Sequence, residues 1–225
     1  MRRAIAIVLA SVLGSLAVGT RDAWANSPAS VGKFQRVATP VVHKNGQAPF
    51  FFMSALFCPY CAAERWAIVE TLQRFGSWSN LEPSTSTSGI DSFAALPTYD
   101  FLHASYTSRF VDFTARDVAD AQGHPLQKMD AAQQALVNRF DPKGGFPFLI
   151  IDGAYVQTDS GYPPGLLAHK TFAQVQSAIR HDTSLGRAIK QESDILTALL
   201  CIGDGNRPTG VCSAAAVRSL VLQAR

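Results

Sequence analysis

The sequence has little charge, few cysteines and no cluster of basic residues. Only 16% of its 225 residues are charged, and the net charge is +3. A basic stripe or patch is the usual mark of a nucleic-acid-binding surface, so we expect no nucleic-acid partner. Past residue 25 the sequence also lacks an apolar run long enough to span a bilayer. Since 47% of the residues are hydrophobic, the chain can still bury a full core as one elaborated domain.

The first 25 residues are typical of a secretory signal peptide. Arg2 and Arg3 precede an apolar stretch over 4–18, and 23–25 reads Ala-Trp-Ala, a small-x-small cleavage site. Cleavage there removes three arginines and one aspartate, which lowers the net charge from +3 to +1. We expect a secreted or periplasmic protein that begins at Asn26 and has no stable membrane insertion. An uncleaved anchor is the alternative.

All four cysteines lie in the part expected to be exported. Export to an oxidising compartment makes two disulfides the natural number, and four cysteines allow three pairings. The spacing favours Cys58 with Cys61 and Cys201 with Cys212. We expect the Cys201–Cys212 bridge to be structural, with a second redox pair as the alternative.

The C-x-x-C motif lies at the junction of an expected strand and an expected helix. The apolar run Phe50–Met53 leads into Cys58, and a helical pattern follows Cys61. A strand that delivers two such cysteines to a helix start indicates a thioredoxin-like redox site. The positive end of the helix dipole favours a thiolate there, and Pro59 fits the first helical turn. A permanent structural disulfide or half of a zinc site would use the same pattern.

The phase of this helix assigns different roles to the two sulfurs. Ile68, Leu72 and Phe75 mark a buried face, and Cys61 shares it because it lies seven residues before Ile68. Cys58 lies at the terminus, off that face and nearer to solvent. We therefore expect Cys58 to be the attacking thiol and Cys61 the resolving thiol.

Elsewhere, strands and helices alternate. Expected strands cover 37–43, 50–53, 98–102 and 109–114, followed by a hairpin around Asp152-Gly153; expected helices cover 58–75 and 130–140, then 185–200, with further ones capped at Thr171 and Ser213. The segments 83–89 and 115–128 read as a Ser/Thr-rich loop and an irregular stretch. We divide the chain into a signal peptide (1–25), a leader (26–36), a main domain (37–182) with an insertion at about 77–128, and a C-terminal helical extension (183–225).

Two motifs together resemble the thioredoxin superfamily. These are Cys58-Pro59-Tyr60-Cys61, a tetrapeptide typical of glutaredoxins, and Phe146-Pro147 at the start of a strand. The resemblance implies an α/β, three-layer fold with a central mixed sheet flanked by helices. It also implies that Pro147 is a cis-proline, and that the main chain of Phe146 binds an extended peptide beside Pro59 and Tyr60.

A longer match is similar to the uncharacterised domain-of-unknown-function family nine-two-nine of exported thioredoxin-like proteins. That resemblance implies fold and export but no reaction. The residues that carry it are 58–66, Arg74-Phe75-Gly76, Ser79-Asn80-Leu81, Tyr106-Thr107-Ser108, Asp141-Pro142 and the tail containing Cys201 and Cys212.

Three positions depart from better-known relatives. Thioredoxins carry a buried carboxylate six residues before the first cysteine and a tryptophan directly before it, whereas this chain has Phe52 and Phe57. The segment 158–162 does not match the glutathione-binding stretch of glutaredoxins. Glu64 is a candidate proton relay to Cys61, although a solvated helix residue is the simpler interpretation.

The sequence predicts an extracytoplasmic thiol–disulfide oxidoreductase that acts on the thiols or disulfides of exported proteins, with a membrane redox partner as a further candidate. It leaves the direction of electron flow open. We expect no cofactor and no metal; a copper carrier would need His103 or His124 beside the two cysteines. The non-enzymatic alternative is a secreted binding or structural protein with a permanent Cys58–Cys61 disulfide.

Overall fold

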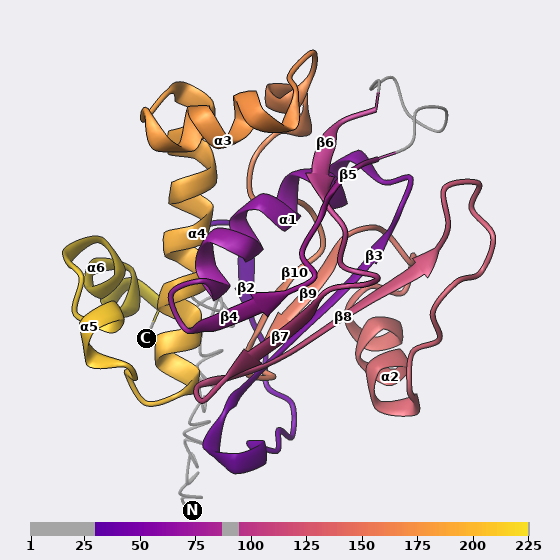
Figure 1. Cartoon of the computed structure of the whole chain (residues 1–225). Coiled ribbons are helices and arrows are strands. Elements are labelled where there is room, and N and C mark those ends of the chain that lie inside the picture. The colour runs from indigo at the N-terminus through magenta and orange to yellow at the C-terminus, as the bar shows by residue number, and fades with distance from the viewer. Residues whose placement is uncertain (1–29, 87–94, 225) are drawn as a thin grey trace, which may run out of the picture.

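The computed structural model describes residues 30–86 and 95–224, which form a mixed α/β structure around a six-stranded sheet (Figure 1). The strand order is β1-β2-β10-β9-β3-β8. Strand β8 runs parallel to β3, and the other neighbouring strands are antiparallel. The strands of this sheet are β1 (Ser30–Val31), β2 (Phe34–Arg36), β3 (Ala48–Ala55), β8 (Val111–Ala119), β9 (Phe148–Ile151) and β10 (Tyr155–Gln157).

Helices cover both faces of the sheet. Phe50 and Phe52 of β3 belong to the large core that includes residues of the first and fourth helices, whereas Phe51 and Met53 belong to a smaller core with Val137 of the second. The continuous apolar run in β3 follows from this two-sided cover. The helices are α1 (Pro59–Leu72), α2 (Ala131–Phe140), α3 (Phe172–Arg180), α4 (Ser184–Gly203), α5 (Thr209–Cys212) and α6 (Ala215–Ala224), with single 3₁₀ turns at η1 (Lys44–Gly46) and η2 (Pro164–Leu167).

Helix α1 is buried on almost every side, not on a single stripe. It lies between the sheet, α4 and the insertion, and only Tyr60 and Glu70 are partly exposed within it. Trp66 anchors its middle: the indole N–H donates to the Pro97 carbonyl (2.9 Å), and the ring contacts Phe172 of α3. Helix α1, which carries the C-x-x-C at its start, is thus a buried helix, and of its charged residues Glu64, Arg65 and Glu70 only Glu70 is partly exposed.

The expected insertion folds as two small antiparallel pairs. Strand β4 (Gly76–Ser79) pairs with β7 (Ser105–Ser108), and β5 (Pro83–Thr85) pairs with β6 (Pro97–Tyr99). Trp78 of β4 stacks on Phe101. The Ser/Thr-rich loop expected at 83–89 therefore begins as β5, and its residues 87–89 lie outside the described part.

Several local predictions are confirmed. The capping boxes Asp130–Gln133 and Thr171–Gln174 open α2 and α3, and Asp152-Gly153 turns the β9–β10 hairpin. The Phe146–Pro147 peptide bond is cis. Each of these features depends on residues a few positions apart, which is why the sequence alone predicts them.

Three boundaries differ from the prediction. Residues 30–36, expected as part of a loose leader, contain β1 and β2, which pair with each other, and β2 pairs with β10. Residues 37–43, expected as a strand, form none; Pro40 lacks the N–H that a continued ladder would need. The stretch 115–128, expected to be irregular, begins with the last five residues of β8, and all of these but Val118 pair with β3.

The expected signal peptide (1–25) and the first residues of the leader lie outside the described residues. Within the described ranges, no helix combines the length and the apolar character that crossing a bilayer requires.

Candidate functional site

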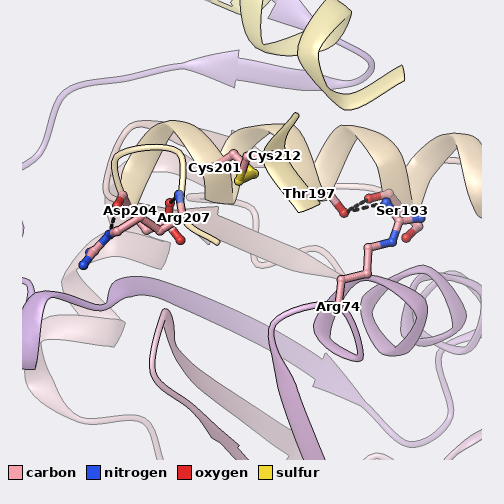
Figure 2. The surroundings of a disulfide bond; sticks show 7 residues. All are labelled: Arg74, Ser193, Thr197, Cys201, Asp204, Arg207 and Cys212. Carbon is pink, nitrogen blue, oxygen red and sulfur yellow. Dashed lines mark hydrogen bonds between the residues drawn. A yellow bond between two sulfur atoms is a disulfide. The ribbon is translucent and has the colours of Figure 1, made fainter. Parts of the chain in front are cut away.

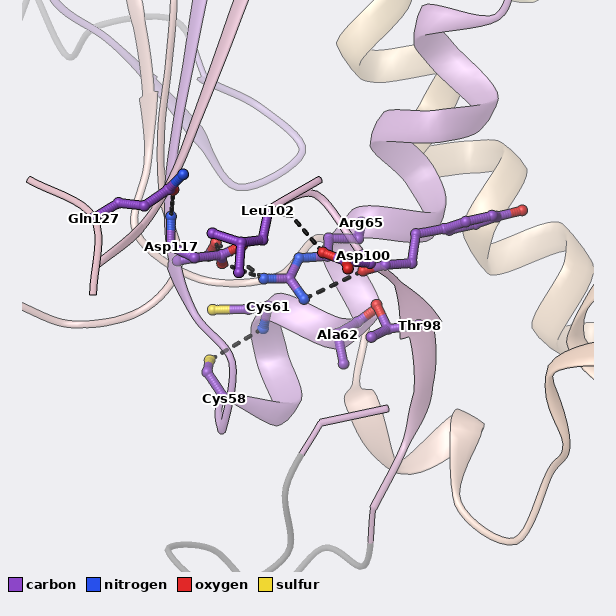
Figure 3. Close-up of polar contacts among 11 residues, drawn as sticks. Cys58, Cys61, Ala62, Arg65, Thr98, Asp100, Leu102, Asp117 and Gln127 are labelled. Carbon is purple, nitrogen blue, oxygen red and sulfur yellow. Dashed lines mark hydrogen bonds and ion pairs between the residues drawn. The ribbon is translucent and has the colours of Figure 1, made fainter. Parts of the chain in front are cut away.

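The two cysteines of the C-x-x-C meet at the first turn of α1, directly after β3 (Figure 3). Cys58 is the N-cap residue, and its Sγ accepts a hydrogen bond from the backbone N–H of Cys61 at 3.1 Å. Pro59 occupies the first helical position, where its missing N–H leaves no bond unmade. Both sulfurs are free thiols. Cys58 keeps 4% of its surface exposed and Cys61 none, so the sequence-based ranking of their exposure is right but the difference is small.

The surroundings shift the pKa values of the two thiols in opposite directions. Burial acts to raise the pKa of Cys58, but hydrogen bonds from Cys61 and the positive charge of Arg65 outweigh it, so the pKa is lowered. Burial, together with the interaction with Cys58, raises the pKa of Cys61 well above the free-thiol value, and Arg65 opposes that rise only in part. Of the two thiols, Cys58 is therefore the one that gives up its proton more readily, and Cys61 keeps its proton to higher pH.

A buried ion pair lies directly behind the sulfurs. Arg65, four residues after Cys61, is 2% exposed, and Asp117 of β8 is 1% exposed. The Arg65 Nη2 contacts Asp117 Oδ1 and donates to Ser54 Oγ at 3.2 Å, while Nη1 donates to the Tyr99 carbonyl at 3.4 Å. Figure 3 shows the guanidinium extending from α1 across Cys61 toward Asp117.

Strand β3 and the segment after β8 complete the anchoring of this pair. The Ser54 hydroxyl donates to Asp117 Oδ1, and the Asp117 backbone N–H donates to Gln127 Oε1 at 2.7 Å. The Arg65 guanidinium also lies over the Phe101 ring, 5.5 Å from its centre. These contacts fix one positive charge beside two sulfur atoms in a place that water does not reach.

The predicted peptide-binding residues form an apolar rim at the same end of α1. The Phe146 and Phe57 rings meet edge to face with their centres 5.8 Å apart, which joins the cis-proline loop to the C-x-x-C turn. Both rings and Tyr60 are half-buried, whereas Pro59 and Pro147 are buried. The structure thus brings Phe146 and Pro147 to the residues next to Cys58.

Glu64 does not lie where the sequence suggested. Its side chain is fully buried, not solvated, and Oε2 accepts from the Gly161 backbone N–H at 2.8 Å, beside Glu192 of α4. Glu64 and Arg65 follow Cys61 by three and four positions, so their side chains lie on either side of it on the helix surface. Glu64 is directed toward α4 and Arg65 toward β8. The groups that surround the Glu64 carboxyl are the Gly161 N–H and the Glu192 side chain, not a cysteine, so the geometry gives no support to a proton relay from Cys61.

The histidines of the copper alternative stay apart from the cysteines. His103 pairs with Asp100 at 2.7 Å and His124 with Asp120 at 3.2 Å, both on exposed loops. Among residues 30–86 and 95–224, no three His, Cys, Asp or Glu side chains gather in a group that could hold a metal ion.

Sequence reasoning missed Arg65, Asp117 and Ser54. One signal for Arg65 was available: the residues one helical turn away from it, Ala62, Ile68 and Val69 among them, are apolar, so a buried Arg65 had to find an anion. Asp117 gave no such signal, since it lay in a stretch expected to be irregular.

The second cysteine pair forms the expected disulfide, in a separate part of the molecule (Figure 2). Cys201 of α4 and Cys212 of α5 are bonded, with Cα atoms 5.7 Å apart. This bridge holds α5 and the Gly/Pro loop before it against the end of α4. It belongs to the C-terminal extension and not to the site at the start of α1.

Comparison with known proteins finds one matching family model but no relative of known activity. The model of a domain of unknown function (DUF929) matches residues 33–142, a segment that contains Cys58, Cys61, Arg65 and Asp117 but ends before Phe146-Pro147. No curated protein matches significantly, and no solved structure does. Over residues 33–142, just under half of its length, the chain is similar to the family described as Domain of unknown function (DUF929).

Proposed function

We propose that this protein is an extracytoplasmic thiol–disulfide oxidoreductase that uses the Cys58–Cys61 pair. The observation that carries the proposal is the pair's own geometry: an N-capping sulfur with a lowered pKa accepts a hydrogen bond from the residue that holds the second, fully buried sulfur. A structural cysteine pair needs no such difference between its two thiols. The location outside the cytoplasm rests on the signal-like residues 1–25.

The element order supports a thioredoxin-like domain. Strand β3 is followed by α1, and β8 then returns parallel to β3; α2 leads into the β9–β10 hairpin, and α3 closes the unit. This is the strand, helix, strand, helix, hairpin, helix succession of that fold, with β4–β7 inserted after α1. The cis-proline loop packs against the C-x-x-C turn through Phe57 and Phe146, as the resemblance implies.

The mechanism follows from the different states of the two sulfurs. The Cys58 thiolate attacks a substrate disulfide, or oxidised Cys58 accepts a substrate thiolate, so that a mixed disulfide forms at Cys58. Cys61 then attacks Cys58 Sγ and releases the substrate. The backbone of Phe146 before Pro147 and the half-buried rings of Phe57 and Phe146 bind main chain and apolar side chains of a protein substrate.

Trapping of the mixed disulfide tests the proposal. In Cys61→Ala the resolving sulfur is absent, so covalent complexes with exported proteins should accumulate and should disappear on reduction. The matched control is Cys58→Ala with Cys61→Ala, which has lost the attacking sulfur and should trap nothing.

The non-enzymatic alternative predicts a different result. A permanent Cys58–Cys61 disulfide would resist mild dithiothreitol in the folded protein, and Cys61→Ala would trap no more protein than the double variant. That pair of results would sink the enzymatic proposal.

A further inference from the structure

The buried Arg65–Asp117 pair bears on a question that the sequence leaves open, which is the direction of electron flow. A charged pair of this kind is a poor stabiliser of a fold, since removing two charges from water costs about as much as their attraction returns. Most residues of α1 around Arg65 are apolar, and the neighbouring Glu64 makes its contact with Gly161 and not with the ion pair. The pair therefore calls for an explanation in terms of what lies next to it, namely the two sulfurs.

The Arg65 charge distinguishes the two redox forms of the site. In the disulfide form neither sulfur carries a charge, and the guanidinium faces one anion, Asp117. In the dithiol form Cys58 can become an anion, and the same guanidinium then faces two anions, the Asp117 carboxylate and the Cys58 thiolate. Since arginine stays protonated at every physiological pH, this additional attraction is always present, and it acts on the reduced form alone.

Three further features favour the same form. The Cys61 N–H bonds to Cys58 Sγ, the sulfur caps the positive end of α1, and the site is dry, so that the attraction is weakly screened. A dithiol that is stabilised relative to its disulfide makes the disulfide a strong oxidant.

We propose that the Cys58–Cys61 disulfide is an oxidant of reduced exported proteins, made so by the buried Arg65 guanidinium, and that its substrates are protein dithiols. This inference rests on the proposed function and adds the direction of transfer. Arg65 is a positioning residue, since it acts on the sulfurs through charge and forms no bond with the substrate.

The step is balanced as a two-electron exchange. One substrate thiolate attacks Cys58 Sγ, the Cys58–Cys61 bond breaks, and Cys61 takes up a proton. The second substrate thiolate then attacks the substrate sulfur of the mixed disulfide, and Cys58 leaves as a thiolate. The substrate loses two electrons and two protons; Cys58 and Cys61 gain the two electrons, one proton remains on Cys61, and one goes to solvent. An external disulfide, here oxidised glutathione, restores the pair.

The test is equilibration of the mature protein with reduced and oxidised glutathione, followed by alkylation and mass measurement. Wild-type Cys58–Cys61 should be reduced by glutathione under conditions in which Cys201–Cys212, an internal reference, stays oxidised. Arg65→Gln should shift the equilibrium at least tenfold toward the disulfide, equivalent to about 30 mV.

Two variants separate charge from folding. Asp117→Asn keeps the guanidinium and removes its competing anion, so it should shift the equilibrium toward the dithiol, opposite to Arg65→Gln; damage to the fold would move both in one direction. Arg65→Lys keeps the charge and should restore most of the shift. The matched control is Arg74→Gln, which breaks the Arg74–Asp194 ion pair just beyond the C-terminal end of α1 and should leave the equilibrium unchanged.

The outcomes distinguish this inference from the function on which it rests. If the pair cycles with glutathione but Arg65→Gln has no effect, or if Arg65→Gln and Asp117→Asn shift the equilibrium in the same direction, the inference is overturned and the oxidoreductase proposal stands. If the pair is never reduced by glutathione but cycles with dithiothreitol, the inference is likewise overturned and the oxidoreductase proposal stands. A pair that does not cycle at all overturns both. If Arg65→Gln does not fold, the Asp117→Asn and Arg65→Lys shifts decide the question.

Discussion

Cys58 and Cys61 lie on one helical turn, yet the pKa of the Cys58 thiol is lowered and that of the Cys61 thiol is raised. The backbone explains the difference. Cys58 caps α1 and receives the N–H of Cys61, whereas the Cys61 side chain points into the core, where burial is complete. The helix start therefore supplies two chemically distinct sulfurs from two identical side chains.

Alkylation should reveal this difference directly. Because its pKa is lowered, Cys58 in the reduced protein should react with iodoacetamide at pH values below those at which a free thiol reacts, and it should do so faster than Cys61 by at least tenfold. Peptide mass mapping after short exposures at several pH values measures both rates. Equal rates, or faster labelling of Cys61, would contradict the assignment of Cys58 as the attacking thiol.

At the scale of elements, α1 carries buried charge toward both of its neighbours. Arg65 faces β8, and Glu64 faces Glu192 of α4. Gly161 lies between the two glutamates: its N–H bonds Glu64, and a Cβ on it would lie 1.9 Å from the Glu192 Cδ. Burial, followed by repulsion from Glu192, raises the pKa of Glu64 well above its usual value, and burial raises the pKa of Glu192 to about 7.

This carboxyl pair should make the protein less stable as pH rises. Both groups bind protons more tightly in the folded state than in the unfolded chain, where a glutamate titrates near pH ~4.3. Below that pH both states keep their protons, so the pair does not lower the free energy of unfolding. Between about pH 4.3 and pH 7 the unfolded state loses protons that the folded state keeps, so the free energy of unfolding falls by on the order of 3 kcal/mol for Glu192.

The measurement is urea unfolding at pH 4.5 to 8 for the wild type and Glu192→Gln. The variant, which has no charge to bury, should lose less stability across this range, and the exposed Glu82→Gln is the matched control. A pH dependence that is the same in all three proteins would show that the pair does not titrate as described.

The elements differ in how far the sequence could predict them. The start of α2, the cap of α3 and the β9–β10 turn each depend on a few adjacent residues, and all three are where the sequence places them. Strands β1 and β2 have no such local signal, because the ladder to β10 that orders them comes from more than a hundred residues away in the chain. The last residues of β8 were not predicted as a strand for the same reason, because they are ordered by their pairing with β3, which is distant in the sequence.

The candidate site likewise has a part that the sequence predicts and a part that it does not. The two cysteines, the capping proline and the cis-proline loop could be read from motifs. The ion pair could not, because Arg65 and Asp117 are 52 positions apart and only the parallel pairing of β3 with β8 brings Ser54 and Asp117 together. Glu64 was misjudged because helix phase places a residue on a face but does not say which element covers that face.

At the scale of the whole molecule, the C-terminal extension supports the helix that carries the site. Thr71 of α1 donates to the Ser193 carbonyl of α4 at 3.1 Å, and Arg74, two residues after the end of α1, pairs with Asp194 of α4 at 2.7 Å. The Cys201–Cys212 bridge then fixes the end of α4 to α5. The extension is thus part of the core that holds α1 and is not an appended tail.

Removal of this bridge should affect stability and leave redox chemistry intact. The loop that it closes separates the cysteines by 11 positions, so the double variant Cys201→Ser, Cys212→Ser should lose about 3 kcal/mol of unfolding free energy in the chain-entropy model. Denaturant unfolding measures the loss, and equilibration with glutathione should give the same Cys58–Cys61 equilibrium as the wild type. A changed equilibrium would mean that the two pairs exchange electrons.

The most direct test of the account is a redox titration of the folded wild-type protein with reduced and oxidised dithiothreitol, approached from both directions and read by mass after alkylation. The account predicts one reversible two-electron transition in which Cys58 and Cys61 gain or lose two alkyl groups together while Cys201 and Cys212 stay bonded. A protein that takes up no alkyl groups until it is denatured, or whose Cys58 and Cys61 stay free under oxidising conditions, would contradict it.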